Sequence, residues 1–62
     1  LDVVIARDPD NADAYRERGR AYQVLRDVAE ARADYQRAAE LYRTQGRTED
    51  LVEVEKLLAA LR

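Results

Sequence analysis

The amino-acid sequence predicts an all-α protein built from antiparallel helical hairpins. Apolar residues recur at three- and four-residue spacing in three successive stretches, which is typical of helices with one buried face. No stretch sustains the alternation of apolar and polar residues that marks a β-strand. The connecting segments are too short to join anything but antiparallel neighbours, so we expect a row of helical hairpins.

The first turn signal is the segment RDPDN, residues 7–11, where one helix is expected to end and another to begin. Pro9 cannot continue a helix, and the side chains of Asp10 and Asn11 can cap the next one. That next helix is predicted over residues 12–25. Its apolar face is expected to carry Ala14, Tyr15, Ala21, Tyr22 and Leu25.

A second long helix is predicted from Asp27 to about Gln45. Asp27 can accept from free amides at the helix start, and Glu30 follows three residues later as in a capping box. The predicted apolar stripe consists of Val28, Ala31, Tyr35, Ala38, Leu41 and Tyr42. The charged residues are expected to lie off this stripe, at Arg32, Asp34, Arg37, Glu40 and Arg43.

The last helix is predicted over residues 48–62. Gly46 suits the left-handed conformation that closes the preceding helix, and Thr48 with Glu49 and Asp50 forms a start signal. The predicted apolar stripe consists of Leu51, Val54, Leu57, Leu58 and Leu61, widened by Val52.

Gly19 lies in the middle of the helix predicted over residues 12–25, where glycine costs roughly 1 kcal/mol relative to alanine. We predict a packing reason: Gly19 and Ala21 face Ala31 and Ala38 of the next helix, so that the two helices approach closely. The alternative is a tolerated surface glycine. The predicted hairpin core is Tyr15, Gly19, Tyr22, Val28, Ala31, Tyr35 and Ala38.

Composition limits the chain to one small domain, residues 1–62. Such a domain buries only about 60% of its unfolded surface, and without cysteine its stability must come from packing. The 13 acidic and 11 basic residues nearly cancel, to a net charge of −2, which argues against nucleic-acid or membrane partners. No apolar run is long enough to span a membrane. We expect a soluble piece of a longer protein, with the cytoplasm as the favoured compartment.

Residues 12–45 carry six residues whose spacing is that of a known pattern: Tyr15, Gly19, Tyr22, Ala31, Tyr35 and Ala38. They stand at the tryptophan, glycine, tyrosine, alanine, aromatic and alanine positions of the tetratricopeptide repeat, so this unit resembles that family. Arg18 replaces the leucine of the pattern. Arg43 replaces its final proline, which suggests that the helix runs on to Gly46, as in a last repeat.

The resemblance implies a division of the chain into three parts. Residues 1–8 resemble the end of a preceding repeat's second helix, residues 12–45 resemble one full repeat, and residues 48–62 resemble a capping helix. The polar outer face of that cap would be formed by Glu49, Asp50, Glu53, Glu55 and Lys56. The implied architecture is a fragment of an α-solenoid with a right-handed superhelical trend.

The residue inventory argues against catalysis. The chain has no histidine, cysteine or serine, which removes most nucleophiles, general bases and transition-metal ligands. The carboxylates of Glu49, Asp50 and Glu53 lack the spacing of a calcium loop, and no glycine-rich phosphate loop is present. We therefore predict no enzymatic activity, no cofactor and no metal site.

The resemblance implies protein recognition, in a concave groove that holds a peptide or a partner helix. By position, the groove residues would be Asp13, Arg16, Glu17, Arg20, Gln23 and Val24. Arg16 and Arg20 are one turn apart and could bind a carboxylate. Glu17 would repel a terminal carboxylate, so a mixed-charge groove favours a mixed-charge partner.

Three alternatives remain open at this stage. In the first, the groove charges form only ordinary surface ion pairs, which contribute little. In the second, the unit is a purely structural terminal repeat of a longer array. In the third, the chain self-associates through an uncovered apolar face formed by Leu1, Val3, Val4 and Ile5.

Overall fold

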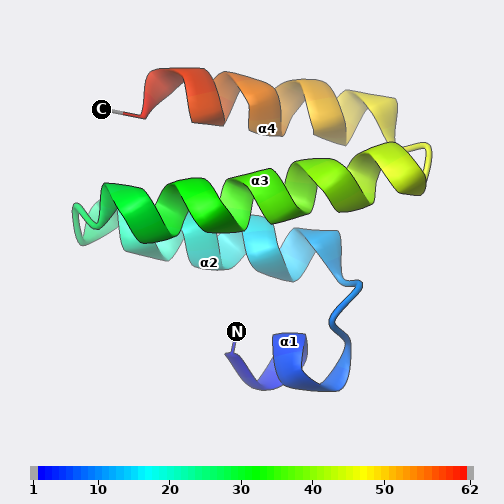
Figure 1. Cartoon of the computed structure of the whole chain (residues 1–62), viewed down its shortest axis with the longest axis horizontal. Coiled ribbons are helices and arrows are strands. Elements are labelled where there is room, and N and C mark those ends of the chain that lie inside the picture. Colours follow the sequence, from blue (N-terminus) through cyan, green and yellow to red (C-terminus); the bar gives the residue numbers. More distant parts are fainter. Residues whose placement is uncertain (1, 62) are drawn as a thin grey trace.

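The structure, a computed structural model, describes residues 2–61 and is all-helical over that range, with no strand among them. Its four helices are α1 (Asp2–Arg7), α2 (Ala12–Val24), α3 (Val28–Thr44) and α4 (Thr48–Ala60). As Figure 1 shows, α3 runs back along α2, α4 runs back along α3, and α1 lies on the side of the hairpin opposite α4. The predicted all-α class and antiparallel neighbours are therefore confirmed.

The predicted N-caps of α2 and α3 are formed, but the reciprocal half of the capping box at Glu30 is not, because the Asp27 amide donates to the Tyr22 carbonyl instead. The Asn11 side chain accepts from the amide of Ala14 at 3.1 Å, and the Asp27 side chain accepts from the amide of Glu30 at 3.3 Å. Helix α4 begins at Thr48 without a side-chain cap, because Arg47 occupies the N-cap position. It ends at Ala60, shorter than the predicted helix over 48–62. Residues 1 and 62, which the sequence places in predicted helices, lie outside the described range.

The turns that join α2 to α3 and α3 to α4 have the same backbone design. In each, an amide after the helix donates back to a tyrosine carbonyl: Asp27 to Tyr22 and Arg47 to Tyr42, both at 2.9 Å. Gly46 has the predicted left-handed conformation, with φ of 70°. Arg26 occupies the corresponding position of the other turn, with φ of 63°. This use of a non-glycine residue was not predicted.

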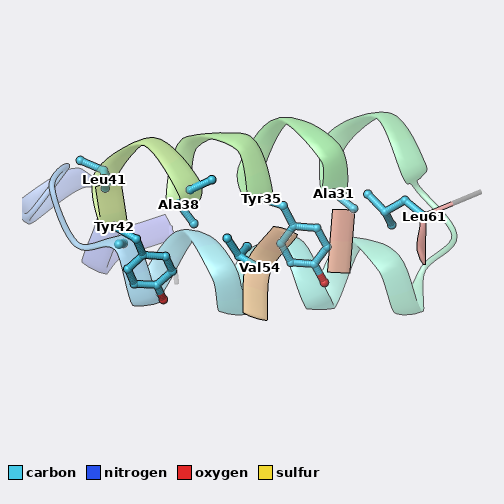
Figure 2. Packing of buried hydrophobic residues seen from close by; sticks show 9 residues of the cluster. Ala31, Tyr35, Ala38, Leu41, Tyr42, Val54 and Leu61 are labelled. Carbon is cyan, nitrogen blue, oxygen red and sulfur yellow. The ribbon is translucent and has the colours of Figure 1, made fainter. Parts of the chain in front are cut away.

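The core lies where α2, α3 and α4 meet. Tyr35 and Tyr42 of α3 and Val54 of α4 are completely buried. Figure 2 shows both tyrosine rings projecting from α3 on the side where Val54 lies. The apolar stripe predicted for α3 is largely confirmed: Ala31, Tyr35, Ala38, Leu41 and Tyr42 are buried and Val28 is half-buried. Tyr15 and Tyr22 of α2 are half-buried and pack against this cluster.

The predicted close approach at Gly19 is present, and its nearest neighbour is the Tyr35 ring. A Cβ atom on Gly19 would lie 2.7 and 2.8 Å from two carbons of that ring. The glycine therefore makes room for an aromatic side chain of α3. Ala21, the second residue predicted for this contact, is exposed because it lies on another face of α2.

Asp34 was predicted to lie off the apolar stripe of α3, but it is buried. Its carboxylate accepts two hydrogen bonds from Arg18, from Nε and from Nη2, both at 2.8 Å. This bidentate pair satisfies the buried charge and joins α2 to α3. Arg18, which departs from the repeat pattern, therefore serves as the partner of Asp34.

Three apolar residues predicted to face the core do not do so. Leu25 lies at the end of α2 and Val52 on the outer side of α4, and both are exposed, as is Ala21. In α1, Val3 and Val4 are exposed and Ile5 is half-buried. Among residues 2–61, no helix has the length and apolar character needed to cross a membrane.

Candidate functional site

Helix α2 carries all of the predicted groove residues, and its first half is tied to α3 and α4. Asp13 accepts from the Tyr42 hydroxyl at 2.6 Å and from Nη2 of Arg47 at 3.0 Å. The guanidinium of Arg47 lies over the Tyr42 ring, 4.8 Å from its centroid. Arg47 also donates to Asp50 at 3.0 Å. The result is a connected polar network where the three helices meet.

Arg16 extends this network along the seam between α2 and α4. Its Nη1 atom lies 3.4 Å from Asp50 and 3.9 Å from Glu53, and its Nη2 atom lies 3.7 Å from Asp13. The pairs Asp13–Arg47 and Arg16–Asp50 are both separated by 34 residues in the sequence. These two pairs therefore tie α2 to the N-cap and first turn of α4, whereas the pair Arg16–Glu53 spans 37 residues.

The electrostatics of this network favour a charged Asp13 and a neutral Tyr42. The hydrogen bond from Tyr42 is the largest cause of the lowered pKa of Asp13; burial opposes it, and Arg47 and Arg16 lower the pKa further. Burial raises the pKa of the Tyr42 hydroxyl, and its hydrogen bond to Asp13 raises it further. The hydroxyl therefore acts as a donor, with no shift toward the phenolate that a nucleophile or base would need.

Gln23 is the third predicted groove residue whose side chain contacts a neighbouring helix. Its side-chain oxygen accepts from the Tyr35 hydroxyl at 2.7 Å. Burial raises the pKa of that hydroxyl, so it remains protonated and donating at neutral pH. Tyr35 is thus fixed at both ends, by Gly19 under its ring and by Gln23 at its tip.

The second half of α2 faces solvent and carries an open hollow. The residues that line it are Glu17, Arg20, Ala21, Gln23 and Val24. Glu17 and Arg20 are exposed, and neither takes part in an ion pair with another residue of the described range 2–61. Val24 is 82% exposed, the largest value among the exposed large hydrophobic residues. We call this surface the α2 hollow.

Two further hollows adjoin the end of α2. One lies at the end of the bundle and is lined by Gln23, Val24, Arg26, Val28, Ala60 and Leu61. We call it the end hollow. The other lies between α2 and the start of α1 and is lined by Asp2, Arg18, Ala21, Tyr22 and Leu25. Gln23 and Val24 line both the α2 hollow and the end hollow, so these two hollows adjoin, and exposed Leu25 borders the third.

The structure therefore divides the predicted groove residues into two groups. Asp13, Arg16 and Gln23 make contacts that hold the helices together, whereas Glu17 and Arg20 border the α2 hollow with Val24. Sequence reasoning did not select Leu25 or Arg26 as surface features. The available signal was the pair Val24–Leu25, two large apolar residues directly before a turn.

No arrangement suited to metal binding was found within residues 2–61, where no group of three or more acidic side chains could hold an ion. Comparison with protein-family models, with curated proteins and with solved structures gives no match for this chain. The function is therefore argued from the geometry of the chain itself.

Proposed function

We propose that this chain is a non-enzymatic protein-interaction module, which binds a peptide or a partner helix over the α2 hollow. The observation that carries the proposal is Val24, an aliphatic side chain left 82% exposed in a hollow bordered by Glu17 and Arg20. Exposed apolar surface with a polar rim is typical of interaction sites. The opposite charges on the rim favour a mixed-charge partner.

The proposal includes a tetratricopeptide-like arrangement with a right-handed superhelical trend. Its support is that two ion pairs, Asp13–Arg47 and Arg16–Asp50, each join residues 34 apart in the sequence, which equals the length of the repeat. The buried aromatic and alanine positions of α3 agree with the same pattern. Under this proposal, α4 closes one side of the hairpin as a capping helix.

A purely structural role is a second candidate, and a specific observation favours it. Asp13, Arg16 and Gln23 are all engaged with α3 or α4, so much of the predicted groove surface is already used for packing. A chain in this role would serve as the terminal unit of a scaffold. The α2 hollow would then remain unused.

The two candidates can be separated by an amide NMR titration of the isotope-labelled chain. The probes are leucine-containing peptides flanked by both acidic and basic residues. The interaction module predicts shifts confined to residues 17–25, and these should disappear in Val24→Asp. The control is Val52→Asp, which alters an exposed valine on α4 that lines neither the α2 hollow nor the end hollow. Titration without any shift in residues 17–25 would support the structural role.

A further inference from the structure

The turn between α2 and α3 contains a residue whose backbone conformation is unfavourable. Arg26 has φ of 63°, a left-handed conformation that costs a non-glycine residue roughly 1 kcal/mol or more. The turn between α3 and α4 makes the same backbone hydrogen bonds with Gly46 at that position. Glycine would therefore satisfy the backbone of the first turn equally well. What distinguishes Arg26 from glycine is its side chain.

That side chain lies at a surface with unusual apolar exposure. Arg26 lines the end hollow together with Val24 and Val28. Val24 and Leu25, the two residues before it, are 82% and 74% exposed. The Arg26 side chain thus lies beside the largely exposed Val24 and Leu25.

The charges around Val24 are predominantly positive. Arg26 on the end hollow and Arg20 on the α2 hollow form no ion pair within residues 2–61, whereas Arg16, Arg18 and Arg47 each do. Glu17 is the single acidic residue that lines either hollow. The neighbouring carboxylate of Asp27 accepts from the amide of Glu30 at the start of α3. One guanidinium group on each side of Val24, that of Arg26 and that of Arg20, therefore remains available to a carboxylate of a partner.

We propose that the end hollow, continuous with the α2 hollow across Val24, binds an acidic peptide segment whose aliphatic side chain packs on Val24. Its carboxylates pair with Arg26 and Arg20. A guanidinium binds a carboxylate through two parallel hydrogen bonds, so the contact fixes the orientation of the carboxylate in addition to attracting its charge. The inference rests on the proposed function and narrows its mixed-charge partner to a segment in which the residues facing Arg26 and Arg20 are acidic.

The test compares three fluorescent peptides by anisotropy at low salt. Each contains the same pair of leucines, flanked by glutamates, by glutamines or by lysines. The glutamate peptide should bind most tightly, and its advantage should shrink as salt is added, because exposed charges are screened. Equal binding of all three would overturn the inference but leave the proposed function intact. No binding of any peptide would overturn both.

Arg26→Gly is the sharpest variant, because it removes the cation and at the same time relieves the backbone. We expect this variant to bind the glutamate peptide about three- to fivefold more weakly and to bind the glutamine peptide with unchanged affinity. Arg43→Ala is the matched control, because it removes an exposed arginine near the opposite end of α3. Unchanged binding of the glutamate peptide to Arg26→Gly would contradict the role assigned to this side chain.

Discussion

Helices α1 and α4 flank the α2–α3 hairpin on opposite sides, but they are held in different ways (Figure 1). Helix α4 contributes the completely buried Val54, and it is joined to α2 through Arg47 and Asp50. Helix α1 buries no residue. Its described ion pair is Asp2 with Arg18, at 2.9 Å, and the Asp2 side chain is 81% exposed.

The difference shows what makes a short helix part of a fold. Isolated helices below about 12–15 residues are marginal in water, so most of their stability comes from packing of an apolar face. Helix α4 has 13 residues, with Val54 buried and the leucines of its stripe half-buried, whereas α1 has 6 residues and leaves Val3 and Val4 exposed. One side of the hairpin is therefore closed by the core, and the other remains largely open.

The largest effect is expected where α4 is anchored. Replacement of Tyr42 by alanine removes a completely buried ring and its hydrogen bond to Asp13, and should cost about 3–5 kcal/mol of unfolding free energy. Because a small domain has only several kcal/mol in total, we expect loss of the cooperative thermal transition. Circular dichroism melting provides the measurement. Tyr42→Phe keeps the ring and should retain cooperativity; a cooperative melt of Tyr42→Ala near the original temperature would contradict this anchoring.

The second prediction concerns the contact between α2 and α3. Gly19→Leu should destabilise the chain by about 1–3 kcal/mol, because its side chain would collide with the Tyr35 ring. The more discriminating variant is Gly19→Ala, which should also destabilise although alanine favours helices by about 1 kcal/mol. Chemical denaturation measures both. A stabilised Gly19→Ala would show that Tyr35 can move away.

The sequence was most informative about the helices and least informative about their polar contacts. Periodicity predicted α2 and α3 because one buried face imposes that pattern on neighbouring residues, and the turn and capping residues predicted their ends to within about one residue. The burial of Asp34 depends on Arg18, which lies 16 residues away, so no local pattern contains it. Likewise, Asp13 and Arg16 find partners 34 residues later in the chain, which is why the predicted groove included side chains that hold the helices together.

A third prediction compares the two turns directly. Arg26→Gly should stabilise the chain by up to about 1 kcal/mol, because it relieves a left-handed arginine, and Gly46→Ala should destabilise it by a similar amount. Paired urea unfolding curves provide the measurement. Changes of the same sign in both variants would contradict the equivalence of the two turns.

The fourth prediction concerns acid stability at the α4 side. The folded state lowers the pKa of Asp13 below its ordinary value of 3.8, so the stabilising contribution is present above about pH 4 and is lost as pH falls through the folded pKa. Unfolding measured between pH 7 and pH 2 should show this decline. Asp13→Asn should be less stable at pH 7 and should show a shallower decline. An unaltered pH profile in Asp13→Asn would show that Asp13 does not contribute to the pH dependence of the free energy of unfolding.

The smallest effect is expected in α1. Val3→Ser replaces an exposed side chain, so the free energy of unfolding should change by less than about 0.5 kcal/mol. The shift of the thermal midpoint measures this change. Val54→Ser, the matched change on the opposite flank, leaves a buried cavity and a buried hydroxyl and should cost several times more. Equal effects of the two serine variants would remove the distinction between α1 and α4.

The most direct test of that distinction is native-state amide hydrogen exchange of the whole chain, followed residue by residue by NMR. If α4 belongs to the core and α1 does not, amides in the middle of α4 should be protected to the same level as those of α3, and the α1 amides should exchange with little protection. Protection of α1 equal to that of α4, or opening of α4 independent of α3, would contradict the account.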